Sequence, residues 1–324
     1  MEIFNHNANV PFLRMRKVSV AIAILLMVAS VVLIFTRGLN YGLDFTGGIS
    51  VEVKYANTID IGDVRKALDE AGIENPVVQS LGGSRQVVIR LQPKDDKAAA
   101  AATAGQSESA RADKVAADVM AALKKERPDA TLSSRNFVTA QVGDELKSDG
   151  SIAAIFVIIG IGIYLWIRFE RRFAVAALLT EVHDTLVTLG VIALVQREFD
   201  MTVLASVLAV IGYSINDKVV VFDRIRELFR LARKADPEEI LNRSINTTLS
   251  RTIITSLFTG ITMAALYFFG GTAVHGFAIT MLIGIVVGTL SSIFVASPIL
   301  LWLGVSKKDL MPQTRDNPEL ARRP

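Results

Sequence analysis

The first residues that could do chemistry are polar side chains inside an apolar stretch running from Ser206 to Arg224. Asn216, Asp217 and Lys218 interrupt it where a membrane helix normally carries apolar side chains. An ionisable group is costly to isolate from water, so an Asp within a span marks a candidate functional site. At ~1.5 Å per residue, Asp217 lies about 10 Å from the end of the stretch. At this depth its short side chain cannot reach the membrane interface. Lys218 is long enough to extend toward the interface and Asp223 lies there, so we expect topology to explain both.

A second group of polar residues lies in the apolar stretch from Phe173 to Val195. Glu181, His183 and Asp184 occupy its first half, with Asp184 about 17 Å along the helix at ~1.5 Å per residue. Two interpretations stay open for these side chains and for Asp217. Either they take part in proton transfer, or they hydrogen-bond neighbouring helices and fix their packing.

Proton transfer has a physical basis in the combination of Asp217 with Arg251, which precedes another apolar stretch. Poor hydration favours the neutral form of a carboxyl group, whereas an approaching guanidinium favours its charged form. Movement of Arg251 toward or away from Asp217 would therefore release or capture a proton, while the Arg itself stays charged. We predict that Asp217, Arg251 and Asp184 couple protons to conformational change.

Enzyme chemistry and cofactor binding find little support in the sequence. The chain has no Cys, and its three His residues, at 6, 183 and 275, are too scattered for an obvious metal site. It has no GxSxG motif or Walker loop, and the Gly-rich GLDFTGG at 42–48 lacks the Lys of a phosphate cradle. We therefore expect no enzyme, metal or cofactor, with protons as the coupling ion. The net charge of +3 gives no sign of a nucleic-acid partner.

Apolar stretches of membrane length recur along the chain, of which 51% of the residues are hydrophobic. The predicted spans are Val18–Thr36, Ser151–Ile167, Phe173–Val195, Thr202–Phe222, Thr252–Phe269 and Phe277–Leu303. The first stretch is longer than the apolar core of a signal peptide, so we expect it to be retained. The predicted fold class is a polytopic α-helical membrane protein.

The distribution of basic residues predicts the orientation in the membrane. Basic residues lie before the first span, in the second-to-third and fourth-to-fifth connections, and after the sixth span: Arg14, Arg16, Lys17, Arg168, Arg171, Arg172, Arg224, Arg226, Arg230, Arg233, Lys234, Arg243, Lys307 and Lys308. The loop 196–201 has only Arg197, and 270–276 has none. We predict that residues 1–17 and 304–324 are cytoplasmic, and that residues 37–149 form a domain outside.

The cytoplasmic connection at 224–250 contains a helix start, because Asp236 is followed by Pro237 and two acids. Its apolar residues Ile240, Leu241 and Ile245 predict an amphipathic helix along the membrane surface. This helix would lead into the fifth span and bring Arg251 to the cytoplasmic end of the bundle.

The outer residues 37–149 alternate between strand and helix patterns. We predict strands near 49–55, 77–81, 87–91 and 131–139, and helices that start after Asp60 and span about 108–126. The low-complexity segment Ala98–Ala104 is expected to be a flexible linker. The order βαββαβ predicts a ferredoxin-like α/β sandwich with a binding or structural role.

Small residues recur every four positions in the last two spans, among them Gly260, Gly284 and Gly288. This spacing places them on one helix face, where small side chains let helices approach closely. Tight helix packing is a sufficient interpretation, and the spacing leaves open whether the neighbouring helix belongs to this chain.

Four motifs in order resemble the SecF family of the bacterial protein-export complex SecDF: NYGLDFTGG after the first span, VHDTLVTLG at 182–190, GYSINDKVVVFDRIRE at 212–227 and TTLSRTIITS at 247–256. The resemblance extends over about residues 10–305. It implies one six-helix half of a resistance-nodulation-division transporter, located in the bacterial inner membrane with its large domain in the periplasm. Departures are confined to the Ala-rich insert.

The resemblance also implies a function and partners. It implies use of the proton motive force to promote export of polypeptides after SecYEG and SecA have driven translocation, with SecD as the partner and YajC and YidC as further candidates. Asp217 and Arg251 match the family's membrane-embedded Asp and Arg, and Asp184 matches a motif position. Structural motif positions are Gly42, Asp44, Gly47, Gly48 and Asn216. The small-residue faces and Asp217 are expected to meet SecD helices.

Two alternatives remain open from the sequence. A proton-coupled exporter of lipids or small molecules shares the scaffold but predicts an apolar substrate pocket in a larger outer region. A non-transporting assembly scaffold of the translocase predicts that Asp217→Asn is silent, whereas Gly288→Leu breaks the complex.

Overall fold

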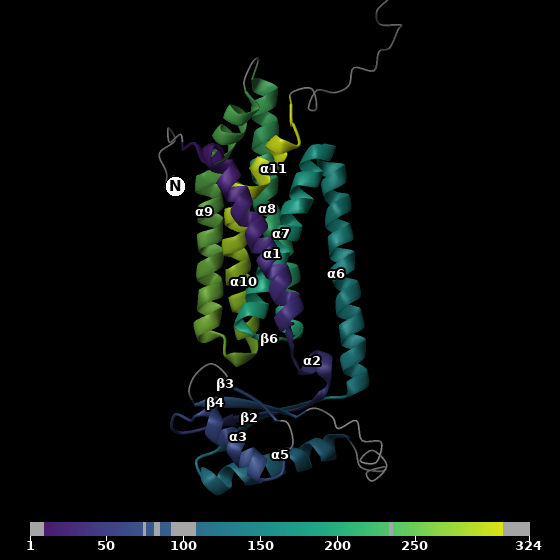
Figure 1. The fold of residues 1–324 in the computed structure, drawn as a ribbon, viewed down its shortest axis with the longest axis vertical. Coiled ribbons are helices and arrows are strands. Elements are labelled where there is room, and N and C mark those ends of the chain that lie inside the picture. Colours follow the sequence, from purple (N-terminus) through teal and green to yellow (C-terminus); the bar gives the residue numbers. More distant parts are fainter. Residues whose placement is uncertain (1–9, 74–75, 81–84, 92–107, 233–235, 307–324) are drawn as a thin grey trace, which may run out of the picture.

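The computed structural model describes residues 10–73, 76–80, 85–91, 108–232 and 236–306 of the 324-residue chain. A bundle of long helices stands on a small α/β domain (Figure 1). The start of α1 and the last helix, α11, lie at the end of the bundle away from this domain (Figure 1). The predicted linker Ala98–Ala104 lies outside the described residues.

Among the described residues, 6 helical segments are long and apolar enough to cross a membrane. They are α1 (Arg16–Arg37, preceded by the short η1, Phe12–Met15), α6 (Ala140–Arg168), α7 (Arg171–Val195), α8 (Met201–Leu231), α9 (Pro237–Phe269), and a sixth made of α10 (Thr272–Ser291), the π-helical turn η2 (Ser292–Ala296) and α11 (Ser297–Trp302). The predicted fold class is confirmed. The π turn in the sixth segment was not predicted.

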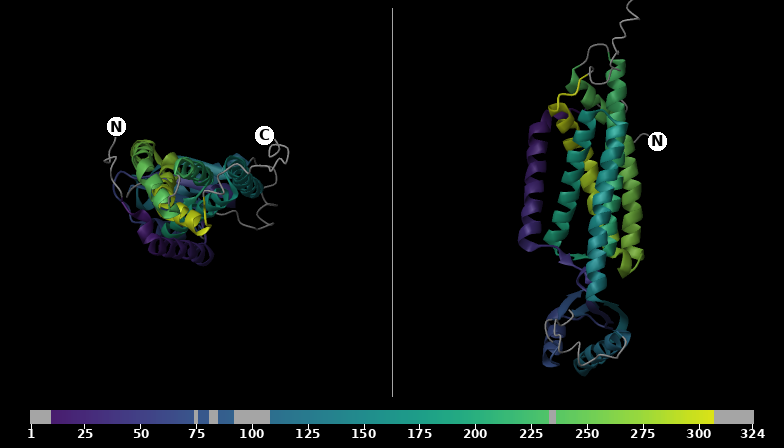
Figure 2. Two further views of the ribbon diagram at one scale, coloured as in Figure 1. Left: turned by 90° about the horizontal axis from the view of Figure 1, so that it is seen from above. Right: turned by 90° about the vertical axis from the view of Figure 1, so that its right-hand side faces the viewer.

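Helix α6 begins earlier than the predicted second span. Thr139 caps it, because its hydroxyl oxygen accepts from the backbone N–H of Val142 at 3.2 Å. The helix therefore continues through polar residues and reaches the α/β domain, which the right-hand view of Figure 2 shows clearly. Its polar first turns rigidly connect that domain to the bundle.

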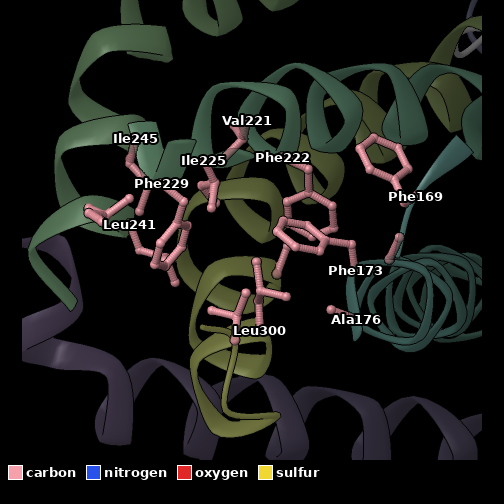
Figure 3. Packing of buried hydrophobic residues seen from close by; sticks show 14 of the residues in the cluster. Phe169, Phe173, Ala176, Val221, Phe222, Ile225, Phe229, Leu241, Ile245 and Leu300 are labelled. Atoms are coloured by element: carbon pink, nitrogen blue, oxygen red, sulfur yellow. The ribbon is translucent and has the colours of Figure 1, made fainter. Parts of the chain in front are cut away.

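The predicted helix start at Asp236 and Pro237 is the start of α9, although the Asp236 side chain makes no capping hydrogen bond. The apolar residues that follow pack into a core shared with α7, α8 and α11 (Figure 3). Leu241 and Ile245 are buried in that core. The apolar stripe expected to lie along the membrane surface is thus covered by the protein itself.

Aromatic packing fixes α7 and α8 against each other in the same core. The ring centroids of Phe173 in α7 and Phe222 in α8 lie 5.4 Å apart at an interplanar angle of 79°. Edge-to-face packing of this kind holds two helices in one relative rotation. One turn deeper along α8, that rotation decides which helix Lys218 faces.

The α/β domain has the predicted βαββαβ order. Its elements are β2 (Gly48–Lys54), α3 (Ile61–Glu70), β3 (Val77–Ser80), β4 (Gln86–Leu91), α5 (Glu108–Glu126) and β5 (Thr131–Val138). The strands form an antiparallel sheet in the order β3-β4-β2-β5, which is the ferredoxin-like arrangement. The sheet faces the bundle, and α3 and α5 cover its other side (Figure 1).

The Gly-rich motif forms the junction between the domain and the bundle. It contains β1 (Asn40–Tyr41) and the single-turn helix α2 (Leu43–Thr46), and β1 pairs in parallel with β6 (Glu198–Phe199) between α7 and α8. The Asp44 carboxylate accepts from the backbone N–H of Met201 at 2.9 Å, at the start of α8. A Cβ on Gly42 would come within 2.9 Å of the Glu198 carboxylate and 3.1 Å of the Asp200 Cβ, so the chain at Gly42 packs closely against these two side chains.

Candidate functional site

Helix α8 packs against α7, α9 and α10, and its polar residues face more than one of these neighbours. Successive residues of an α-helix point about 100° apart, because one turn takes about 3.6 residues. The consecutive residues Asp217 and Lys218 therefore reach different helices. Lys218 faces α7 and Asp217 faces α9.

The ammonium group of Lys218 donates to two carboxylates of α7 and to one hydroxyl of its own helix. It lies 2.6 Å from Glu181 Oε2, 2.8 Å from Asp184 Oδ2 and 2.9 Å from Ser214 Oγ. Lys218 is 0% exposed. The prediction that Lys218 extends toward the interface is wrong, because two carboxylates one turn apart on α7 hold its ammonium inside the bundle.

Asp184 is saturated with hydrogen-bond donors. Its Oδ2 accepts from the hydroxyl groups of Ser214 and Ser291, each at 2.6 Å, in addition to Lys218. Its Oδ1 lies 2.9 Å from Nδ1 of His183. Ser291 is the last residue of α10 before the π turn, so Asp184 joins α7, α8 and α10 next to an irregular helix segment of a kind often found at functional sites.

Asp217 has fewer hydrogen-bond partners than Asp184 among the described residues. It is only 2% exposed, yet its Oδ2 has no hydrogen-bond partner among the described residues. Arg251 and Ser256 of α9 lie close enough to act on its charge. Arg251 itself is exposed on the surface of this chain. The structure thus brings the predicted pair Asp217 and Arg251 to neighbouring helices, with Asp184 in a separate cluster.

Asp223 lies at the end of α8 and pairs with Arg168, their side chains approaching to 2.6 Å. Both side chains are 39% exposed, and the interfacial position of Asp223 stays a prediction. This ion pair provides an exposed counterpart to the buried carboxylates of the site.

The predicted packing glycines fall into two groups. A Cβ on Gly288 would come within 2.7 Å of Ser214 Oγ, and Gly284 is packed against Val210, so this face of α10 contacts α8 of the same chain. A Cβ on Gly260 of α9 would meet nothing within 4 Å. Asn216 is likewise exposed on α8. The two α10 glycines therefore pack within the chain and not against a partner.

Sequence reasoning missed the roles of Glu181 and Lys218 as an ion pair. The signal is present in the spacing: Glu181 and Asp184 are one turn apart on α7, and Ser214 and Lys218 are one turn apart on α8. Pairing the two turns requires the rotation of each helix, which spacing alone does not give. Among the described residues, no group of three or more His, Asp or Glu side chains is placed to hold a metal ion.

Two protein families match the sequence of this chain. "Protein export membrane protein SecD/SecF, C-terminal" matches residues 118–306, and the "SecD/SecF GG Motif" matches residues 32–59. The first match includes α6 to α11 with the whole polar site, and the second contains the junction motif.

Similar proteins extend over nearly the whole chain. The protein translocase subunit SecF of Pseudomonas aeruginosa is 42% identical over 307 residues, which is 94% of this chain and 95% of the relative. The SecF of Escherichia coli O157:H7 is 38% identical, covering 97% of this chain and 94% of the relative.

Among solved structures, the crystal structure of SecDF from Thermus thermophilus, a translocon-associated membrane protein, matches with a TM-score of 0.81 and 31% identity over 93% of this chain. This chain spans 39% of the length of that SecDF chain. A second SecDF structure, described as the super-membrane-facing form, matches with the same identity and coverage but a TM-score of 0.65.

Proposed function

The chain belongs to the SecD/SecF family of protein-export membrane proteins, and we propose that it uses the proton motive force to promote export of polypeptides after SecYEG and SecA have driven their translocation. It is a transport component and not an enzyme. Protons are the coupling ion. Asp217 takes up and releases them under the control of Arg251.

The observation that carries this proposal is the buried, incompletely bonded carboxylate of Asp217 beside a cation at the surface of the chain. An unpaired buried carboxylate is unfavourable, so Asp217 gains either from taking a proton or from a closer approach of Arg251. The two solutions correspond to different positions of α9 relative to α8. Protonation and helix movement are thereby linked.

The orientation follows from the distribution of basic residues. Arg168, Arg226 and Arg230 lie at the end of the bundle away from the α/β domain, and we assign that end to the cytoplasm. The α/β domain then lies in the periplasm of a bacterial inner membrane, where it meets the exported polypeptide. The helix α6 and the junction motif transmit movement of the bundle to it.

The principal partner in this proposal is SecD. This chain corresponds to 39% of a SecDF chain, so the remaining length of that relative supplies what a separate SecD subunit would supply here. The exposed side of α9 that carries Arg251 is the surface we assign to this partner. SecYEG is the further partner in the membrane, with YajC and YidC as other candidates.

Differences among SecDF structures support a moving device. Two SecDF structures match this chain with equal identity and coverage but with TM-scores of 0.81 and 0.65, so their parts are arranged differently. A proton that crosses ~100 mV supplies about 2.3 kcal/mol, so several protons are needed for sizeable mechanical work on a polypeptide.

Asp217→Asn tests the proposal in the complex with SecD, reconstituted with SecYEG and SecA in vesicles. We expect the variant to assemble normally but to lose the proton-gradient-dependent part of polypeptide release, because Asn cannot exchange a proton. Asp223→Asn is the matched control, since it makes the same change at an exposed ion pair of the same helix. Unchanged gradient-dependent release in Asp217→Asn would contradict the proposal and favour a non-transporting assembly scaffold.

A further inference from the structure

The cluster around Lys218 contains more acids than cations. Glu181 and Asp184 face the single ammonium of Lys218, and these three residues are 6%, 0% and 0% exposed. With both acids ionised and His183 neutral, the cluster would carry one uncompensated negative charge inside the bundle. Burial of an uncompensated charge is strongly unfavourable, so one bound proton stabilises the cluster.

Asp184 is a poor place for that proton. Its Oδ2 accepts from Lys218, Ser214 and Ser291, and its Oδ1 lies at hydrogen-bond distance from His183. A protonated Asp184 would lose at least one of these bonds, and its new O–H group would face donors. Asp184 is therefore the fixed anion of the cluster.

Glu181 accepts a proton without losing a bond. Its Oε2 binds Lys218, whereas its Oε1 is buried and has no hydrogen-bond partner among the described residues. Glu181 also lines a cavity of about 190 Å³ between α6, α7 and α8, which has mainly apolar walls such as Ile158 and Ile211. A neutral carboxyl group suits this environment better than a charged one.

His183 is the competing site, because protonation of its imidazole would also balance the charge. Its Nε2 is buried without a partner among the described residues. His183 also lines an apolar groove of about 300 Å³ beside α1, whose walls include Leu26 and Leu290. A protonated His183 would pair with Asp184 through Nδ1, but its Nε2–H would have no acceptor among the described residues, whereas a proton on Glu181 removes a charge altogether.

We propose that Glu181 is a second proton-binding carboxyl group of this protein. Lys218 follows Asp217 on α8 and binds Glu181, so it couples the two carboxyl groups. This inference rests on the proton-driven function proposed above and adds a second site to it. Lys218 acts electrostatically on both Glu181 and Asp217. Its position between them links the two sites across α8.

Gain or loss of the proton on Glu181 would change a contact between helices. When Glu181 is neutral, Asp184 is the stronger attraction for the ammonium of Lys218, and loss of the proton draws the ammonium toward Glu181. Asp184 is bonded to Ser291 at the start of the π turn, so this shift alters the contact between α7 and the sixth span. The charged groups that act on Glu181 are Lys218 from α8 and Asp184 from its own helix, while the α6 residues lining its cavity are apolar.

Carboxyl labelling of the native complex with SecD in vesicles tests the location of the proton. Dicyclohexylcarbodiimide, which modifies protonated carboxyl groups in apolar surroundings, is the probe, and peptide mass spectrometry identifies the labelled residue. We expect label on Glu181 that declines as the pH is raised, and none on Asp184. Absence of label on Glu181 across the pH range, or label on Asp184 in its place, would overturn the inference.

Infrared difference spectra of the same complex provide an independent measurement. Glu181→Gln is nearly isosteric and should remove one carbonyl band of a protonated carboxyl group, whereas Asp217→Asn and His183→Asn should leave that band in place. A Glu181→Gln spectrum identical to the native one would contradict the inference. If Asp217→Asn leaves polypeptide release unchanged while Glu181 still binds its proton, the proposed function fails and the second proton site stands.

Discussion

On the α7 side of α8, the ammonium of Lys218 meets Glu181 and Asp184 at 2.6 and 2.8 Å, with the Lys 0% exposed. On the α9 side, one oxygen of Asp217 has no partner among the described residues, and Arg251 is exposed. The two sites start from consecutive residues of one helix. One is closed within the chain, and the other is open toward its surface.

This difference indicates that the two sites have different roles in the bundle. The closed site joins α7, α8 and α10 through charge-assisted hydrogen bonds, which are stronger and more directional than neutral ones. Asp217 has no equivalent bond network to α9 among the described residues, so few polar bonds to Asp217 would have to break if α9 shifted beside it. A SecD subunit placed on the exposed side would complete the open site.

Lys218→Met should have the largest effect, because it would leave the buried carboxylate of Asp184 without its cation and Glu181 without its bond to the ammonium. Removal of one partner from a buried ion pair typically costs about 3–5 kcal/mol, so we expect a marked loss of folded protein and of export activity. Thermal unfolding of the purified chain in detergent measures this.

Asp217→Asn is the matched comparison, since it changes the neighbouring residue and should leave the unfolding temperature nearly unchanged. Addition of Glu181→Gln to Lys218→Met should change the stability little, because Glu181 is already uncharged in our proposal and the unpaired charge is that of Asp184. If Lys218→Met unfolds at the temperature of the native chain, the closed site is not a structural centre and the comparison between the two faces fails.

The error over Lys218 shows where sequence reasoning stops. A long side chain on an isolated helix can extend to the interface, but this expectation fails for Lys218 because α7 supplies two acids that hold its ammonium inside the bundle. The rotation of α7 and α8 depends on packing contacts such as Phe173 with Phe222, which join residues distant in sequence. The π turn at Ser292–Ala296 has a local signal that was not used, because Pro298 lacks the N–H that would bond to the carbonyl of residue 294 in a regular helix.

Local patterns, by contrast, predicted the α/β domain well. The helix expected at about 108–126 is α5 with those bounds, and the N-cap Asp60 accepts from the backbone N–H of Gly62 at 2.8 Å. Strand alternation and helix caps depend on neighbouring residues, so a single chain carries them completely. The depth of Asp217 in the membrane stays a prediction, whereas its neighbour Arg251 was predicted from the order of the spans.

Gly288→Leu and Gly260→Leu test the same contrast between a closed and an open face with a moderate effect. Leu at 288 would enter space held by Ser214, and overpacking of this kind costs about 1–3 kcal/mol. A Cβ at 260 would meet no atom of this chain within 4 Å, so we expect the isolated protein to keep its stability with Leu at this position. Unfolding temperatures of the two variants measure the difference.

The same two variants also distinguish contacts within the chain from contacts with a partner. Co-purification with SecD should be weakened by Gly260→Leu if the open face of α9 is its binding surface. Equal unfolding temperatures for both variants would contradict this contrast. They would show that Leu at 288 fits between α8 and α10 as easily as Leu at 260 fits on α9.

We expect variants of α8 to have their smallest effect in the α/β domain. The titration of Tyr55 in this domain is the reference measurement for them. Burial raises the pKa of the Tyr55 hydroxyl to about 12, with opposing contributions from Arg127 and Asp129. The folded domain therefore holds this proton more tightly than the unfolded chain, whose tyrosines titrate near ~10. The associated stability is present below about pH 10 and is lost as the pH rises toward 12.

Tyrosinate absorbance of Lys218→Met, minus that of the same variant with Tyr55→Phe, should show an unchanged transition. A transition shifted toward ~10 would mean that the closed site also supports the α/β domain, because loss of the buried environment is what lowers this pKa.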